Sequence, residues 1–135
     1  MDSFIVQNEV AEALADGSPV VALESTLISH GLPAPHNLQT AQKAETVIRA
    51  SGAVPATIAV IDGQVRVGLS TAELERLADT NNPWKVSRDN LATAIAQNAT
   101  GGTTVAATML CAYQTRIGIF ATGGIGGVHL SLIHI

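Results

Sequence analysis

The sequence predicts an α/β fold with a largely parallel sheet and one local β-hairpin, in a single domain of 135 residues. Three short apolar runs, residues 19–24, 56–61 and 117–122, are suited to buried strands, and segments with helical spacing of apolar residues separate them. Asp62-Gly63 follows the second run and precedes an alternating segment, which is typical of a two-residue hairpin turn.

The first part of the chain begins with a predicted helix over residues 4–15 that ends near Gly17. Its apolar residues at near-helical spacing are Ile5, Val6, Val10 and Leu14. The strand 19–24 comes next. After a loop with glycine and proline, a second helix is predicted from about Asn37 to Ala50.

The strand 56–61 and the segment QVRVGL are the two arms of the predicted hairpin. Ser70 and Glu73 then form a capping box that begins a helix ending near Asp79. After a loop, the residues KVS predict a short extended piece, and RDNLATAIAQNA predicts a further helix.

The segment TGGTT interrupts the helical pattern, and Thr103 or Thr104 is the expected cap of a mostly apolar helix, VAATMLCAYQT. The third strand, 117–122, is expected to be buried, and a glycine-rich loop, GGIGGVH, follows it.

The amino-acid composition limits the classes of function and partner that the chain can have. Apolar residues make up 47% of the chain and charged residues 13%, as in a globular domain. A net charge of −4 and the lack of a basic tract argue against a nucleic-acid partner. We expect no membrane partner, since no apolar run reaches about 18 residues. The single cysteine, Cys111, and an N-terminus unlike a secretory signal favour the cytoplasm.

Glu24 is the first candidate for chemistry, because it directly follows a buried strand, where α/β folds bind ligands. It fits a general acid or base and, equally well, a structural cap or ion-pair partner. Lys85 suits binding of a phosphate or carboxylate, but a solvated lysine is the simpler interpretation.

Other patterns give weaker signals. The residues TGGTTVAAT open a helix, which suits either an anion cradle or a closely packed helix entry. The neighbours Ser29 and His30 are not expected to contact each other as a catalytic pair. The histidines lack metal-ligand spacing, and Cys111 is expected to be a buried, inert thiol.

Five segments taken together resemble one family. VALESTLISHGLPAP, GAVPATIAVIDGQVRVGLS, KVSRDNL, GGTTVAATM and FATGGIGGVH resemble, in order, the N-terminal part of pseudouridine-5′-phosphate glycosidase, also called pseudouridylate synthase. The resemblance implies a three-layer α/β/α fold and a homotrimer. It implies reversible cleavage of the C–C glycosidic bond of pseudouridine 5′-phosphate to uracil and ribose 5-phosphate.

The resemblance also assigns residues. Glu24 matches the proton donor, Lys85 a substrate-binding lysine, and Val105 a position whose backbone contacts substrate. The family uses a divalent metal, typically Mn²⁺, and a nucleophilic lysine that forms a covalent adduct. The metal ligand and that lysine lie beyond the GGVH segment in the family, and neither Lys43 nor Lys85 matches the nucleophile.

These departures predict a particular domain division. Residues 1–129 are expected to be the N-terminal part of one glycosidase domain that is truncated at its C-terminus. Residues 130–135 are expected to be a tail that does not belong to the family and that is a candidate artefact. Without the nucleophile we expect this chain to be inactive. The alternatives are a non-catalytic phosphate- or nucleotide-binding α/β fragment and a folding fragment without a ligand.

Overall fold

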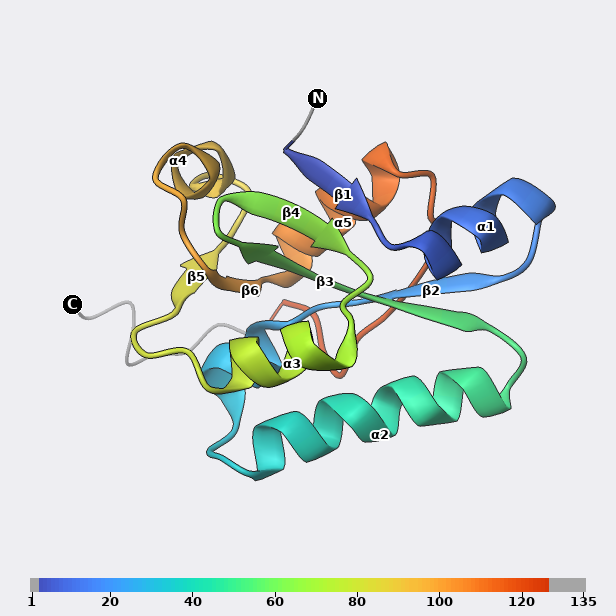
Figure 1. Ribbon diagram of the computed structural model, residues 1–135, viewed down its shortest axis with the longest axis horizontal. Helices are drawn as coiled ribbons and strands as arrows, with labels where there is room; N and C mark the ends of the chain where they lie inside the picture. The colour runs from blue at the N-terminus through green and yellow to red at the C-terminus, as the bar shows by residue number, and fades with distance from the viewer. Residues whose placement is uncertain (1–2, 127–135) are drawn as a thin grey trace.

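The structure, a computed structural model, describes residues 3–126, which form a seven-stranded sheet with helices on both faces (Figure 1). The strands are β1 (Phe4–Val6), β2 (Val20–Leu23), β3 (Val54–Ile61), β4 (Gln64–Val67), β5 (Trp84–Val86), β6 (Gly101–Thr103) and β7 (Ile119–Ala121). The helices are α1 (Asn8–Asp16), α2 (His36–Ala50), α3 (Thr71–Ala78), α4 (Leu91–Ala96) and α5 (Val105–Gln114), with a π-helical turn, η1 (Leu27–Gly31).

The sheet is mostly parallel, as predicted. Its main order is β1-β4-β3-β2-β7, and β6 pairs with both β3 and β5. The pairs β1–β4, β2–β3, β2–β7 and β5–β6 are parallel, whereas β3–β4 and β3–β6 are antiparallel. The β3–β4 pair is the predicted hairpin, and its turn residues Asp62 and Gly63 both have positive φ, at 50° and 75°.

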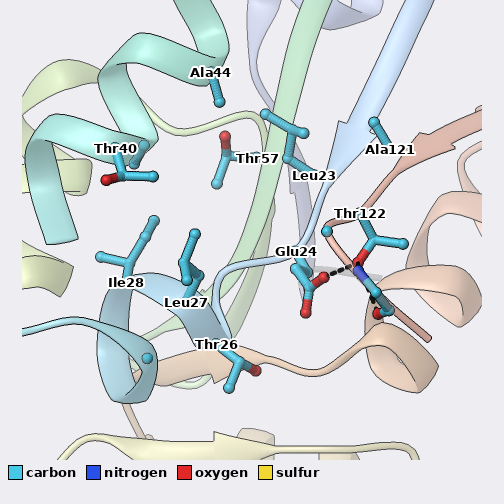
Figure 2. Close-up of a pocket in the computed structure, with 14 residues that line it drawn as sticks. Leu23, Glu24, Thr26, Leu27, Ile28, Thr40, Ala44, Thr57, Ala121 and Thr122 are labelled. Atoms are coloured by element: carbon cyan, nitrogen blue, oxygen red, sulfur yellow. Dashed lines mark hydrogen bonds between the residues drawn. The ribbon is translucent and has the colours of Figure 1, made fainter. Parts of the chain in front are cut away.

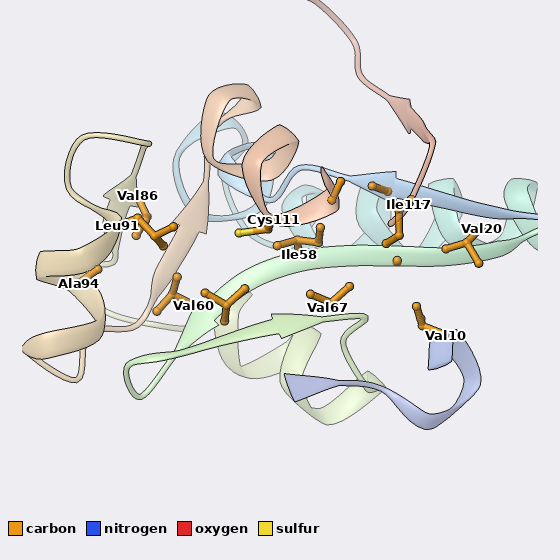
Figure 3. Close-up of a cluster of buried hydrophobic side chains, with 14 of the residues drawn as sticks. Val10, Val20, Ile58, Val60, Val67, Val86, Leu91, Ala94, Cys111 and Ile117 are labelled. Carbon is orange, nitrogen blue, oxygen red and sulfur yellow. The ribbon is translucent and has the colours of Figure 1, made fainter. Parts of the chain in front are cut away.

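Strand β3 divides the core into two layers, because its alternate side chains face opposite sides of the sheet. Ile58 and Val60 belong to a cluster with residues of α1, α4 and α5, which includes Cys111 (Figure 3). Ala59 and Ile61 belong to a second cluster with residues of η1, α2 and α3. Helices therefore cover both faces, which confirms the three-layer α/β/α fold.

Strands β2 and β6 lie along the same edge of β3 and run toward each other. Leu23 at the end of β2 pairs with Thr57, and Gly102 of β6 pairs with Ala59 in the opposite sense. Ile58 lies between these two pairings. The carboxyl ends of β2 and β6 therefore meet at Ile58, and this junction positions the candidate site.

Three elements differ from the sequence prediction. Residues 4–6 are strand β1 instead of the first turn of a helix, because they pair with β4 in parallel register. Gly101–Thr103, predicted to be only a helix breaker, is strand β6. Residues 29–31, predicted to begin a loop, belong instead to a π-helical turn over Leu27–Gly31.

The third predicted strand is present, but it is not buried. Ile119 of β7 is 55% exposed, because within residues 3–126 this strand has one neighbour, β2, and lies at the sheet edge. The expected family boundary at residue 129 and the tail 130–135 lie outside the described residues.

Candidate functional site

A cavity of about 490 Å³ lies at the carboxyl ends of the parallel strands β2 and β7 (Figure 2). Its walls are mostly apolar. The lining residues are Leu23, Glu24, Thr26, Leu27, Ile28, Gly31, Thr40, Ala41, Ala44, Thr57, Ala121, Thr122, Gly123 and Gly124. This place is where open α/β sheets bind ligands, so the cavity is the candidate site.

Glu24 is the one carboxylate among the lining residues. It is half-buried, and its Oε1 accepts a hydrogen bond from the hydroxyl of Thr122 (Figure 2). The amide of Gly124 in turn donates to Thr122 Oγ1 at 3.3 Å. Within the described residues, Glu24 Oε2 has no hydrogen-bond partner, so this oxygen remains available to a ligand in the cavity.

The backbone after Glu24 is held by buried hydroxyl groups. Ser25 Oγ donates to the Ile58 carbonyl at 2.6 Å and accepts from the Thr103 amide at 2.8 Å. Thr103 Oγ1 donates to the same carbonyl at 2.7 Å, and the Ser25 amide donates to the Thr103 carbonyl at 3.2 Å. The Thr108 hydroxyl lies 2.8 Å from Thr103 Oγ1. Ser25, Thr103 and Thr108 are all 0% exposed.

Hydrogen bonds between neighbouring segments bring Lys85 and Val105 near this junction. The amide of Thr104, which precedes Val105, donates to the carbonyl of Val86 at 2.9 Å. Thr104 Oγ1 also donates to Ser87 Oγ at 3.0 Å. The end of β5, with Lys85, is thus joined to the start of α5.

The structure therefore places the three predicted site residues on connected segments, but only Glu24 lines the cavity. Lys85 is exposed on β5, and Val105 is half-buried as the first residue of α5. Their predicted contacts with substrate remain predictions.

A second carboxylate lies behind the cavity wall. Thr57 lines the cavity, and its hydroxyl donates to Glu45 Oε2 at 2.7 Å. Burial raises the pKa of the Glu45 carboxyl above 4.5, while the Thr57 hydrogen bond and the charge of Arg49 lower it. Glu45 thus fixes the orientation of the Thr57 hydroxyl.

The glycines of TGGTT serve close packing. A Cβ on Gly101 would lie 2.1 Å from the Trp84 carbonyl oxygen, and one on Gly102 would lie 2.2 Å from Ser29 Oγ. This favours the closely packed alternative, with Thr104 as the cap of α5, since its side chain accepts from the Ala107 amide.

The expectation that Ser29 and His30 do not contact each other is wrong. Ser29 Oγ lies 2.6 Å from His30 Nδ1, and His30 Nε2 lies 3.1 Å from the Pro83 carbonyl oxygen. The π-helical turn η1 brings the neighbouring side chains together. Neither residue lines the cavity, so the pair ties η1 to the loop before β5.

Sequence reasoning missed Thr122, Ser25 and Thr57. Thr122 carried a usable signal, because it follows a predicted strand just as Glu24 does. Ser25 and Thr57 carried none, since their contacts depend on strand register. Thr26 Oγ1, also at the cavity, is buried without a hydrogen-bond partner in the described part of the chain.

The donor set of residues 3–126 does not fit a divalent metal. No group of three His, Cys, Asp or Glu side chains is close enough to hold one there, and Glu24 stands alone in the cavity. In the same residues, no helix is long and apolar enough to cross a membrane.

A match to a family model shows which protein family the chain belongs to. The model described as indigoidine synthase A like protein matches residues 9–134. The chain belongs to this family.

The predicted resemblance is also confirmed, because curated relatives of the chain are named pseudouridine-5′-phosphate glycosidase. One from Rhodospirillum centenum (strain ATCC 51521 / SW) is 60% identical over 128 residues, covering 95% of this chain and 40% of that protein. One from Geobacillus kaustophilus (strain HTA426) is 52% identical over 130 residues, covering 96% of this chain and 43% of that protein.

Two solved structures share the fold. A prealnumycin C-glycosynthase, solved in complex with ribulose 5-phosphate, has a TM-score of 0.83 and 42% identity, covering 96% of this chain and 41% of that one. An indigoidine synthase A-like protein from Thermotoga maritima has a TM-score of 0.82 and 30% identity, covering 95% of this chain and 41% of that one. The chain thus spans about 40% of the length of these relatives.

Proposed function

We propose that this chain forms part of a pseudouridine-5′-phosphate glycosidase, an enzyme that reversibly cleaves the C–C glycosidic bond of pseudouridine 5′-phosphate to uracil and ribose 5-phosphate. One observation carries the proposal. Glu24, the residue that matches the proton donor, lines the cavity at the carboxyl ends of β2 and β7 with one carboxylate oxygen available.

Each site residue has a part in this proposal. Glu24 gives and recovers a proton during bond cleavage, and Thr122 holds its carboxylate toward the cavity. Lys85 pairs with the 5′-phosphate as a cation, and the backbone of Val105 contacts the substrate. The apolar wall, with Leu23 and Leu27, packs against the substrate.

The remaining parts of the proposal concern the whole protein. We propose that the ligands of the Mn²⁺ ion and the nucleophilic lysine lie outside residues 3–126, and that the enzyme is a homotrimer. The free, buried thiol of Cys111 supports a cytoplasmic location, where thiols stay reduced.

A chimera tests the proposal. Residues 3–126 replace the matching part of the Rhodospirillum centenum glycosidase, and release of uracil from pseudouridine 5′-phosphate is measured. We expect activity in the chimera and a loss of roughly 10²-fold or more with Glu24→Gln. A folded chimera without activity, or an active Glu24→Gln variant, would contradict the proposal. The 135-residue chain alone is expected to release no uracil.

The binding-module alternative predicts a different result. In that case, titration of the chain alone with ribose 5-phosphate in a calorimeter gives clear saturable binding, while the chimera stays inactive.

A further inference from the structure

We propose that Ser25 and Thr103 form a positioning clamp that fixes the proton donor Glu24 and the substrate-contacting start of α5 at Val105 relative to each other. The inference rests on the proposed function for the roles of Glu24 and Val105. The geometry of the clamp stands by itself.

The clamp forms where the carboxyl ends of strands β2 and β6 meet. Strands β2 and β6 approach each other along one edge of β3, so no strand amide is placed to pair with the carbonyl of Ile58 between them. A buried carbonyl without a partner is costly. The hydroxyls of Ser25 and Thr103 both donate to it, at 2.6 and 2.7 Å, and so satisfy both of its lone pairs.

The same two residues also bind each other directly. The Ser25 amide donates to the Thr103 carbonyl, and the Thr103 amide donates to Ser25 Oγ. Since the hydrogen of Thr103 Oγ1 is directed to Ile58, Thr108 of α5 donates its own hydroxyl hydrogen to Thr103 Oγ1. Every hydroxyl in this fully buried group therefore has a defined direction, which makes the group rigid.

Both ends of the clamp adjoin the candidate site. Glu24 directly precedes Ser25, and Val105 comes two residues after Thr103. Any shift between β2 and β6 would move the carboxylate of Glu24 relative to the start of α5. A misplacement of about 1 Å at a reacting group is enough to lower a rate about 100-fold. Ser25 and Thr103 are thus positioning residues that need not touch the substrate.

The test compares variants of the full 135-residue chain by NMR, with the carboxyl carbons of glutamate labelled and the Glu24 signal assigned through Glu24→Gln. Thr103→Val removes one hydroxyl and keeps the side-chain shape. We expect it to shift the Glu24 carboxyl and Val105 amide signals together and to speed exchange of the Ser25 amide roughly tenfold. Thr103→Ser restores the hydroxyl and is expected to return these signals toward their original positions.

The control is Val10→Ala, which opens a cavity in the buried core at α1 and leaves every clamp hydroxyl in place. The proposal would be overturned if Thr103→Val left the Glu24 carboxyl and Val105 amide signals unshifted. It would also be overturned if Val10→Ala shifted these signals equally. If Thr103→Val does not fold, Ser25→Ala applies the same criteria. These signals do not depend on turnover, whereas failure of the proposed function would appear in the activity assay, as an inactive chimera or as an active Glu24→Gln variant.

Discussion

Glu45 is a carboxyl group whose ionisation the fold opposes. Burial raises its pKa above 4.5, so the folded chain binds a proton here more readily than the unfolded chain. The contribution of protonated Glu45 to folding stability is fully present below the unfolded-state pKa of 4.5, and it is lost as the pH rises through the folded-state pKa. We expect Glu45→Gln, which keeps an acceptor for Thr57, to raise the melting temperature at about pH 7 relative to the unsubstituted chain, and to do so less at about pH 4.

Thermal unfolding followed across this pH range tests the prediction. Glu12→Gln, on an exposed position of α1, is the matched control and is expected to give little change between the two ends of the range. Parallel curves for Glu45→Gln and the unsubstituted chain would show that Glu45 ionises without cost.

Cys111 is predicted to be chemically inert in the folded chain. Its side chain is buried in α5, and burial raises the pKa of the thiol to about 12, so almost no thiolate exists near neutral pH. We expect no alkylation by iodoacetamide at about pH 8 while the chain is folded, and full alkylation in urea, as measured by mass spectrometry. Rapid labelling of the folded chain would mean that α5 opens readily.

Single residues were predictable where position alone carries the signal. Glu24 follows a run of strand residues, and that placement was enough to put it at a ligand-binding edge. The hydroxyl of Ser25 could not be assigned in the same way. Its partners, Ile58 and Thr103, are 33 and 78 residues away, and only the meeting of β2 and β6 brings them to it.

Among the elements, the β3–β4 hairpin depends on one glycine in its turn. Gly63 has a φ of 75°, and a Cβ there would lie 2.7 Å from the Ile95 carbonyl oxygen and 2.8 Å from the Cα of Asn98. Gly63→Ala thus combines backbone strain with a clash against backbone atoms. Gly52 is a suitable control, because its φ is 88° and no atom lies within 4 Å of the added Cβ.

We expect Gly52→Ala to lower the free energy of unfolding by about 1 kcal/mol through strain alone. Gly63→Ala is expected to lower the free energy of unfolding by at least about 2 kcal/mol more than Gly52→Ala does, since the two backbone atoms that its Cβ would meet cannot shift without a cost in energy. Urea denaturation of both variants measures the difference. Equal losses would show that the hairpin turn relaxes without cost.

Elements with strong local signals were predicted, whereas the short strands β1 and β6 were not. The capping box of Ser70 and Glu73 is formed at the start of α3, because both of its hydrogen bonds are local. Strands β1 and β6 have only three residues each, and they exist through their pairing with distant strands. A period of two cannot be recognised in three residues, so Ile5 and Val6 were assigned to the helix that follows.

At the scale of the whole molecule, the cavity results from strand order. Strands β2 and β7 are parallel neighbours although nearly a hundred residues separate them, and this brings Thr122 to Glu24. The sequence predicted that both strands end at one edge of a sheet. It did not predict that they are adjacent, because that depends on the crossovers between them.

We expect strand β7 to promote association of this chain. Within residues 3–126 its outer edge has no partner, and Ile119 is exposed on it. An apolar sheet edge is a template for pairing with another chain, and a lysine on such an edge opposes pairing. We expect Ile119→Lys to reduce concentration-dependent association, measured by sedimentation, and to change the free energy of unfolding by less than about 0.5 kcal/mol.

The matched control is Val47→Lys, an equally exposed apolar position on α2, where a helix surface offers no free backbone groups. It is expected to leave association unchanged. If Val47→Lys reduced association as much as Ile119→Lys, net charge rather than the edge of β7 would be the cause. If neither had an effect while Tyr113→Lys on the exposed face of α5 did, the association would involve the helical layer and not the sheet edge.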